Sequence, residues 1–414
     1  MEARSIDVAV LGGGAAGLMA AIRARRHGAS VDLLEKNRRC GAKILISGGG
    51  RCNLTTTREG PALLASFRGA QAAFLKPSFA ALSPQRLRAF FEEHGVETVE
   101  EELEKVFPAA DRASVVLDAL LAAAEAAGVV IHTQCAVQAI EQAEGGFRIR
   151  HAGGEVLARR VILATGGKSW PKAGTTGDGY AFARTLGHTV TRLFPALAPL
   201  HTPDLVWRAL SGLTLTTCAV SVEEADGTLL RFERPVLFTH EGLSGPGPMD
   251  VSGTVEARGG ATVSIDLLPA IAEQDLDALL AERARKGVPH VDGLLPDGIP
   301  QRLRPVLLQR AGIASGTRAG ELPREARRAL SSILKRLEFK IPKSLGFDQA
   351  EVTRGGVALD EVNPRSLESL IVPGFHVVGE VLDIDGPIGG FNFQAAFATG
   401  WAAGDAVARA LHSA

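Results

Sequence analysis

A glycine-rich turn between a strand and a helix, within residues 6–35, restricts the fold more than any other part of the sequence. Ile6–Leu11 is mostly apolar, Ala15–His27 favours a helix, and Val31–Glu35 is a second apolar run. This order predicts a βαβ unit. The turn fits G-x-G-x-x-G, in which Gly12 permits a tight turn, Gly14 admits a pyrophosphate and Gly17 lets helix and strand pack closely. Glu35 ends the second strand, where an acid hydrogen-bonds ribose hydroxyls. The pattern predicts a dinucleotide site without a 2'-phosphate.

Two later strand ends favour FAD over NAD as the dinucleotide. Leu163-Ala164-Thr165-Gly166-Gly167 ends one strand, and Val377-Val378-Gly379-Glu380 ends another more than 200 residues later. An NAD fold needs neither, whereas an acid at position 380 is suited to hydrogen-bond a ribitol. Three such elements resemble the glutathione-reductase-like FAD superfamily, with Thr165, Gly166, Gly379 and Glu380 among the expected contacts. No second strand, G-x-G-x-x-G and helix unit exists, so we expect NAD(P)H, if it is the electron donor, to dock only transiently.

The segment Ser47–Asn53 combines flexible backbone with reactive side chains. Three consecutive glycines ending at Gly50 let the backbone approach a planar ring or a pyrophosphate. Arg51 offers a guanidinium to phosphate or flavin, and Asn53 offers an amide. Cys52 is a candidate catalytic thiol, and the alternative is a buried cysteine that only packs. The chain has no C-x-x-C or C-x-x-x-x-C pair, which argues against disulfide-reductase chemistry.

Three further loops are candidate sites. The loop at 174–179 contains Asp178 and opens a helix that runs to Gly187. The turn at 386–392 precedes the last helix, whose free N–H groups suit the negative charge of a reduced flavin, although a simple entry turn is the alternative. The loop at 238–246 carries His240, for which we weigh a catalytic role against a purely structural turn.

Composition bounds the class of protein and its domains. The 414 residues include 45 Lys+Arg and 46 Asp+Glu, a net charge of -1 that by itself does not suggest nucleic-acid binding. No apolar run approaches the ~18 residues of a membrane span. The four cysteines lack metal-binding spacing, so we predict no metal and a cytoplasmic location. Residues 92–104 contain seven Glu and no Lys or Arg, which suggests a solvated face.

Changes in the residue pattern along the chain predict three domains. Short β-branched runs at 191–270 indicate an inserted β-barrel domain, and 271–345 indicate a small helical domain broken by prolines. Residues 1–190 and 346–414 then form a discontinuous α/β domain of the glutathione-reductase-like, Rossmann type that binds FAD. The sequence does not set the oligomeric state.

A series of short segments extends across nearly the whole chain in a fixed order: GGGAAG, EK, AKILISGGGRCN, VFP, ATGG, TGDGY, THEGLSGP, EVTRGGV and GEVLDIDGPIGGFN. They resemble the bacterial HI0933-like flavoprotein family, also described as the aminoacetone oxidase family. The resemblance implies an FAD domain split by a β-barrel and a helical domain. It assigns the following residues to FAD: Ala15, Ala16, Glu35, Lys36, Lys43, Arg51, Cys52, Asn53, Val137, Glu380, Asp383, Gly390, Phe391 and Asn392. Ala42 stands where the family usually has a basic residue, which removes one phosphate contact.

The activity is less defined than the cofactor. The resemblance implies an FAD-dependent oxidoreductase with one of three activities: oxygen-dependent oxidation of a small amine such as aminoacetone, reduction of an activated C=C bond in a steroid-like acid, or reduction of uridine in ribosomal RNA. We favour reduction of a C=C or uracil-like ring, and an FAD-binding scaffold or sensor without turnover is the opposing class. Residues 299–343 carry 11 Lys/Arg against three acids. This charge suits an RNA-facing surface, and the alternative is a solvated helical face and a small-molecule substrate.

Overall fold

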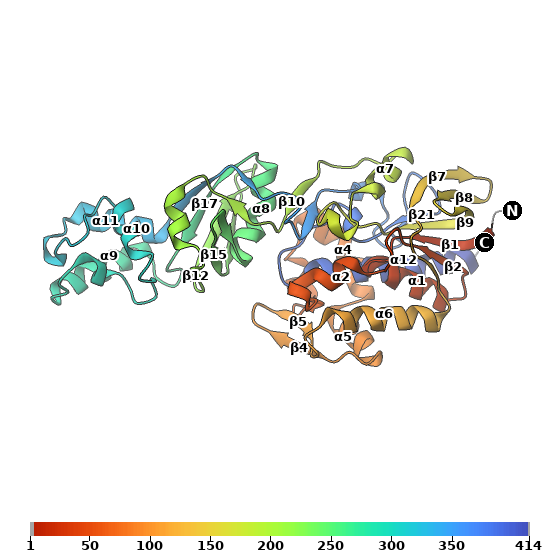
Figure 1. The fold of residues 1–414 in the computed structure, drawn as a ribbon, viewed down its shortest axis with the longest axis horizontal. Helices are drawn as coiled ribbons and strands as arrows, with labels where there is room; N and C mark the ends of the chain where they lie inside the picture. Colours follow the sequence, from red (N-terminus) through yellow and green to blue (C-terminus); the bar gives the residue numbers. More distant parts are fainter. Residues whose placement is uncertain (1–3, 413–414) are drawn as a thin grey trace. The chain divides into compact units, whose positions relative to one another are not determined.

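The computed structural model describes residues 4–412, and the chain divides into two compact units (Figure 1). One unit contains the residues up to Phe194 together with those from Glu351 onward, and the other is Pro195–Ala350. The first unit is therefore discontinuous. The domain limits at 190/191 and 345/346, and the separation of a β-barrel domain from a helical domain, stay predictions.

The first unit is built on a seven-stranded sheet. Its order is β6-β2-β1-β9-β8-β7, and β21 also pairs with β9. The strands are β1 (Arg4–Leu11), β2 (Val31–Leu34), β6 (Val130–His132), β7 (Val137–Ala143), β8 (Gly146–His151), β9 (Gly154–Leu163) and β21 (Phe375–Val377). β6, β2, β1, β9 and β21 pair in parallel, whereas β9, β8 and β7 pair antiparallel. This arrangement confirms the predicted Rossmann-type α/β fold.

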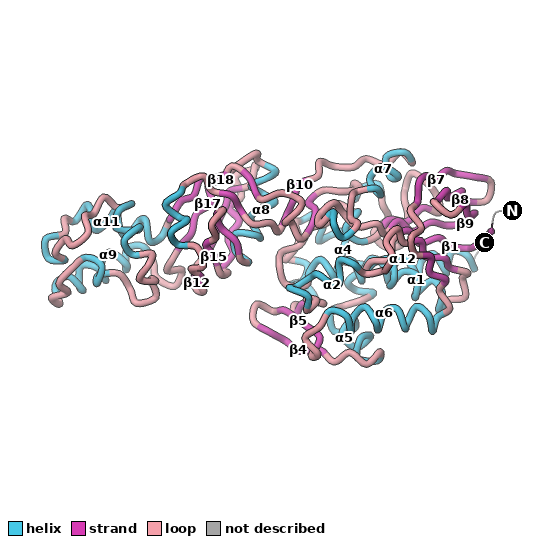
Figure 2. The backbone as a smooth tube through the Cα atoms, viewed as in Figure 1, coloured by secondary structure: helices cyan, strands magenta, loops and turns pink. Residues whose placement is uncertain are grey.

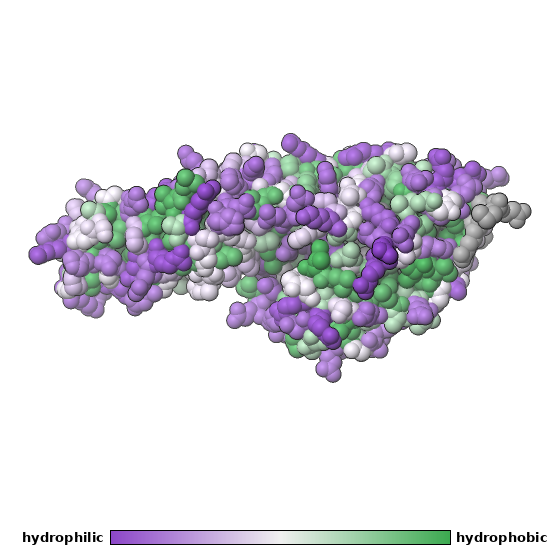
Figure 3. Space-filling model, viewed as in Figure 1, coloured by the Kyte–Doolittle hydropathy of each residue, from purple (hydrophilic) through white to green (hydrophobic). Residues whose placement is uncertain are grey.

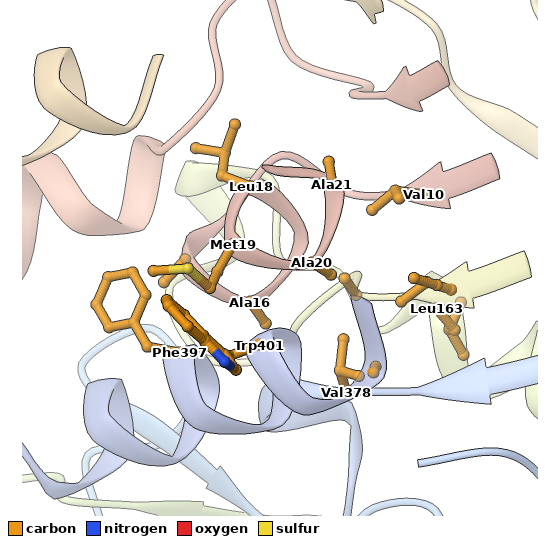
Figure 4. Close-up of a cluster of buried hydrophobic side chains, with 14 of the residues drawn as sticks. Val10, Ala16, Leu18, Met19, Ala20, Ala21, Leu163, Val378, Phe397 and Trp401 are labelled. Carbon is orange, nitrogen blue, oxygen red and sulfur yellow. The ribbon is translucent and has the colours of Figure 1, made fainter. Parts of the chain in front are cut away.

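Helices from opposite ends of the chain pack together beside this sheet. α1 (Ala15–Arg26) contacts both α6 (Ala113–Ala127) and α12 (Phe391–His412). A Cβ on Gly400 would lie 2.3 Å from the Ala16 carbonyl oxygen, and one on Gly404 2.5 Å from that of Ala20. Small residues thus allow the helix backbones to approach closely, and Figure 4 shows Ala16 beside Trp401 in the resulting core. The last helix is therefore part of the same core as the first.

Shorter elements surround this core. They are α2 (Ala42–Ile46), β3 (Thr55–Thr56), α3 (Gly60–Leu64), α4 (Gly69–Ala81), α5 (Pro84–Glu93), β4 (Thr98–Glu101), β5 (Lys105–Pro108) and α7 (Asp178–Thr185). β3, β5 and β4 form a small antiparallel sheet. Figure 2 shows β4 and β5 as adjacent strands of a hairpin. The sequence did not predict this hairpin.

The second unit combines two antiparallel sheets with helices. One sheet has the order β12-β15-β16-β11-β19 and the other β14-β13-β17-β18. Their strands are β11 (Leu200–His201), β12 (Thr214–Leu215), β13 (Ala219–Glu223), β14 (Leu229–Glu233), β15 (Val236–Phe238), β16 (Gly242–Ser244), β17 (Ala261–Asp266), β18 (Leu337–Ile341) and β19 (Lys343–Ser344). The helices are α8 (Pro246–Ala257), α9 (Glu273–Arg285), α10 (Arg304–Arg310) and α11 (Arg324–Lys335).

One hydrophobic core serves both the strands and the helices of the second unit. Trp207, Phe238 and Phe339 pack with ring centroids 4.5–6.2 Å apart, and Leu280 and Leu330 of the helices belong to the same cluster. The short runs of 191–270 were interpreted only as strands, but α8 also lies within that range. Among residues 4–412, no helix is both long and apolar enough to cross a bilayer.

Candidate functional site

The glycine turn after β1 presents an open helix N-terminus. A Cβ on Gly12, whose φ is +106°, would lie 2.6 Å from the Ala164 carbonyl oxygen, and one on Gly17 would lie 1.9 Å from the Gly12 carbonyl oxygen. A Cβ on Gly14 would meet no atom within 4 Å. α1 has no capping side chain and no acid in its first turn. Its first N–H groups, including those at Ala15 and Ala16, are thus suited to a phosphate.

Glu35 is fixed at the end of β2 by the backbone around it. Its Oε2 accepts a hydrogen bond from the Gly13 N–H and its Oε1 one from the Asn37 N–H, both at 2.8 Å. The residue is only 7% exposed. Its carbonyl oxygen accepts from the Cys135 N–H, which places Val137 two residues further along the same segment. Each carboxylate oxygen keeps lone-pair capacity for a ribose hydroxyl.

Two predicted contacts, Lys36 and Asp178, bind each other. Lys36 Nζ lies 2.5 Å from Asp178 Oδ2 and donates to Thr176 Oγ1 at 2.6 Å. Burial alone raises the pKa of Asp178, but the hydrogen bonds from Lys36 and Thr176 outweigh it and hold that pKa below its usual value. The pair ties the residue after β2 to the start of α7. Its charges are already matched without a cofactor.

Thr165 supplies a polar atom that the protein itself leaves unsatisfied. Its buried Oγ1 has no hydrogen-bond partner within residues 4–412, and a Cβ on Gly179 would lie 1.9 Å from it. Thr165 and Gly166 lie two and three residues after the end of β9, next to the Gly12 turn. An orphaned hydroxyl and an uncapped helix N-terminus at one sheet edge fit the phosphate and ribose groups of FAD.

Glu380 and Lys43 are also brought together, although 337 positions separate them. Lys43 Nζ lies 2.5 Å from Glu380 Oε2 and donates to Ser169 Oγ at 2.7 Å. Glu380 Oε1 accepts from the Thr353 N–H at 2.8 Å. Next to it, a Cβ on Gly379 would lie 2.8 Å from the Cβ of Ala16. The second predicted strand end thus lies against α1, with its carboxylate held by protein groups.

The loop before α12 approaches the segment that follows Cys52. A Cβ on Gly390, with φ +85°, would lie 2.1 Å from the Thr55 carbonyl oxygen. The Asn53 amide fits with its oxygen accepting from the Gly390 N–H at 3.0 Å and its nitrogen donating to the Thr55 carbonyl at 3.1 Å. Asn392 closes the loop through two hydrogen bonds of 2.9 Å to Gly386.

The neighbouring side chains of this loop are largely engaged within the protein. Phe391 is fully buried. Asp383 accepts a hydrogen bond from Thr191 Oγ1 at 2.9 Å. The predicted contacts Asn53, Gly390, Phe391 and Asn392 belong to one connected region, whereas Asp383 is held by Thr191. Their role toward the ribitol and ring stays a prediction.

The Arg51 side chain is engaged by protein groups in this structure, and its role toward phosphate or flavin stays a prediction. Its guanidinium pairs with Glu101 and Asp111 and lies 4.1 Å from the centre of the Phe107 ring. These carboxylates raise the pKa of Arg51. The interpretation of residues 92–104 as a solvated face was therefore incomplete, because Glu101 binds Arg51 and Glu104 binds Arg58.

Cys52 is completely buried, and burial raises the pKa of its thiol to about 12. A neutral, enclosed thiol is a poor nucleophile. This favours the packing interpretation over a catalytic one.

His240 lies exposed in the turn between β15 and β16. The Thr239 N–H donates to the Gly242 carbonyl at 2.8 Å, and the Gly242 N–H to Thr239 Oγ1 at 3.1 Å. The Glu241 carbonyl also accepts from the Thr202 N–H at 3.1 Å, so the turn is held by groups other than the His240 ring, which is consistent with the structural alternative. Among the described residues, no group of three His, Cys, Asp or Glu side chains could hold a metal ion.

The basic residues of 299–343 fall into two groups. Six of them are engaged by acids or carbonyls: Arg302, Arg304, Arg310, Arg327, Lys335 and Arg336. Five have exposed side chains that form no ion pair or hydrogen bond within residues 4–412: Arg318, Arg324, Arg328, Lys340 and Lys343. Figure 3 shows hydrophilic side chains over the end of the second unit that carries α9 and α11. Fewer basic side chains are thus available to a partner than the 11 counted in the sequence.

A comparison of the whole chain with known protein families shows which family it belongs to. The profile of the HI0933-like protein Rossmann domain matches residues 6–406. The chain belongs to the HI0933-like family. This confirms the resemblance seen in the sequence. It also confirms an FAD-dependent oxidoreductase as the class of enzyme.

Two curated HI0933-like relatives match almost end to end. One is the Escherichia coli ribosomal RNA dihydrouridine synthase, 32% identical over 401 residues, which cover 96% of each chain. The other is the Clostridium scindens 3-dehydro-bile acid delta(4,6)-reductase, 33% identical over 410 residues, which cover 97% of this chain and 98% of the relative. Similar identity to proteins with different substrates means that overall similarity does not identify the substrate of this family member.

Solved structures show the fold at greater distance. E. coli quinol fumarate reductase FrdA matches with a TM-score of 0.53 and 17% identity, covering 100% of this chain and 72% of that one. The 3-ketosteroid delta1-dehydrogenase of Sterolibacterium denitrificans matches with a TM-score of 0.52 and 14% identity, covering 98% of this chain and 100% of that one. At these identities the likeness concerns the fold alone.

Proposed function

We propose that this HI0933-like protein binds FAD along the Gly12 turn, Glu35 and the Gly390 loop, and reduces a C=C bond conjugated to a carbonyl group. The observation that carries the proposal is the near end-to-end identity of 32% and 33% with two relatives. Dihydrouridine arises when the C=C bond of the uracil ring is saturated, and a 3-dehydro-bile acid delta(4,6)-reductase acts on ring double bonds conjugated to a 3-oxo group. Both names thus describe reduction of the same type of bond, a C=C bond conjugated to a carbonyl group.

The residues of this chain have the roles expected for such a cofactor. The α1 N-terminus binds the pyrophosphate, Glu35 the adenosine ribose, and the N-terminus of α12 stabilises negative charge on the reduced ring. FAD, when bound, supplies the hydride, and NAD(P)H is the proposed transient donor that restores it. The buried Cys52 thiol supports a mechanism that uses no thiolate. The proposed location is the cytoplasm.

An anaerobic spectroscopic assay tests the function. The FAD-loaded protein is mixed with NADH or NADPH, and the flavin absorbance near its visible maximum is followed. We expect bleaching, followed by recovery when unmodified ribosomal RNA or a 3-oxo-4-ene steroid acid is added. Bleaching by aminoacetone and recovery with oxygen alone supports the amine oxidase instead. No bleaching by any donor supports an FAD-binding scaffold or sensor.

RNA is the macromolecular candidate substrate because exposed cations lie on and beside α11. Changing Arg318, Arg324 and Arg328 together to Gln removes up to three phosphate contacts. RNA affinity should then weaken, and the slope of log K against log salt should become shallower by ~2–3. Arg327→Gln is the matched control, because Arg327 is held by Asp277 at 2.8 Å. An unchanged slope in the triple variant, or no salt-dependent binding by the wild type, favours a small-molecule substrate.

A further inference from the structure

One cation beside the glycine segment Gly48–Gly50, Lys105, acts on the nearby carboxylates of Glu101 and Glu351 but forms no ion pair with either. Lys43, Arg51, Arg58 and Lys105 lie on the elements that surround this segment. Lys43 pairs with a carboxylate of the loop after β21, Arg51 with two carboxylates, and Arg58 with one at 2.6 Å. The Lys105 ammonium forms no ion pair and no hydrogen bond with residues 4–412. A partly exposed ammonium that no carboxylate holds in an ion pair keeps its three N–H donors available to a ligand.

The strand geometry directs Lys105 toward this segment. Lys105 begins β5, where it pairs with Thr56 on one side and Glu101 on the other. Side chains two positions apart share a face of a strand, so Lys105 and Phe107 project the same way. The Phe107 ring lies under the segment, because a Cβ on Gly48 would be 3.2 Å from its edge. Lys105 therefore shares the face that meets the glycine segment.

The β4–β5 hairpin also reaches the second glycine loop. The carbonyl oxygen of Leu103, at the hairpin tip, lies 3.7 Å from a Cβ placed on Gly389. Glu100, Glu101, Glu102, Leu103 and Lys105 line a hollow of about 530 Å³ on the hairpin, and two of these glutamates are paired with Arg88 and Arg51. The charges of Lys105 and Lys43 both act on Glu351. The hairpin that carries Lys105 thus lies next to both loops assigned to the flavin ring.

We propose that the Lys105 ammonium binds the carbonyl oxygen of the substrate, a compound whose C=C bond is conjugated to that carbonyl. This rests on the proposed function. The double bond receives a hydride from the reduced cofactor at the carbon distant from the carbonyl. Its π electrons move toward the oxygen, forming an enolate that Lys105 stabilises by charge and hydrogen bond. The adjacent carbon then takes a proton from water. The substrate gains two electrons and two hydrogens, and NAD(P)H resupplies the hydride.

A phenolate probe tests this assignment without turnover. A phenolate resembles an enolate in shape and charge and perturbs flavin absorbance when it stacks on the ring. The FAD-loaded protein is titrated with 4-nitrophenolate. We expect Lys105→Met to weaken binding about 10- to 100-fold, as loss of a charged hydrogen bond does, and Lys105→Arg to restore most of it. Lys76→Met is the matched control, because Lys76 is an exposed lysine of α4. It should bind as the wild type does.

Turnover with the enone acid or uridine substrate separates the two proposals. If the wild type reduces a substrate and Lys105→Met does so equally well, the Lys105 assignment is overturned and the function stands. If no substrate is reduced but phenolate binding depends on Lys105, the oxygen-binding site stands and the function fails. Absence of phenolate binding by the wild type also overturns the assignment. Flavin content and thermal unfolding are checked for each variant, and Lys105→Gln replaces Lys105→Met if the latter loses FAD.

Discussion

Replacing Glu35 probes the adenosine end of the proposed site, and the structure separates two expected effects. The Gly13 and Asn37 N–H groups both donate to this 7% exposed carboxylate. In Glu35→Ala each N–H loses its acceptor at ~1–3 kcal/mol, so we expect the FAD-free protein to lose about 2–6 kcal/mol of unfolding free energy. The missing ribose hydrogen bond costs FAD a further ~1.5–3 kcal/mol, which is about 10- to 150-fold in Kd.

The assay compares Glu35→Ala with a control that has only the first effect. Asp7 Oδ2 accepts hydrogen bonds from the N–H and hydroxyl of Ser30 at 2.9 and 2.7 Å, at the other end of the βαβ unit. Asp7→Ala should destabilise the FAD-free protein in urea but leave the FAD Kd, measured by flavin fluorescence, within twofold of the wild type. Equal FAD affinity for wild type and Glu35→Ala, or an equal loss of affinity in Asp7→Ala, would refute the reasoning.

Three further substitutions test the loops. Cys52→Ser should keep FAD and more than ~10% of turnover, because a lost nucleophile costs far more; a thousandfold loss with FAD still bound contradicts this. Gly390→Ala should lower the unfolding free energy by more than ~1–2 kcal/mol and reduce flavin content, since its Cβ would meet the Thr55 carbonyl at 2.1 Å in a left-handed conformation; a stable, fully loaded variant argues against that approach. His240→Asn should change the unfolding free energy by less than ~0.5 kcal/mol. Abolished turnover at that stability would establish a catalytic role for the imidazole.

The sequence predicted the elements that depend on the local pattern of apolar residues and glycines. The strand, turn and helix around Gly12 and the strands that end near Thr165 and Gly379 lie where their apolar runs and glycines indicated. The partner of Lys43 could not be predicted, because its carboxylate is 337 positions away and meets it only through the tertiary fold. Arg51 was assigned to phosphate or flavin by its chemistry, but the register of the β4–β5 hairpin decides which of many glutamates reaches it.

The missed helix α8 has a different cause. Its first turn contains Pro246 and Pro248 and is preceded by Gly245, residues that usually mark a loop. Proline is nevertheless compatible with the first helical turn, where its missing N–H has no intrahelical partner. A helix-start pattern in a β-rich segment was thus interpreted as a turn.

The packing of α12 against α1 determines when the FAD domain can be completed on the ribosome. Its first and last helices are separated by 156 residues of the second unit, Pro195–Ala350, and by the segment that follows. At roughly 5–20 residues per second, synthesis of that unit alone takes roughly 8–30 s. During this interval α12 has not been synthesised, so the apolar face of α1 that packs against it stays uncovered. The second unit, in contrast, already has all of its strands. We expect the nascent N-terminal part to depend on chaperones until the last helix emerges.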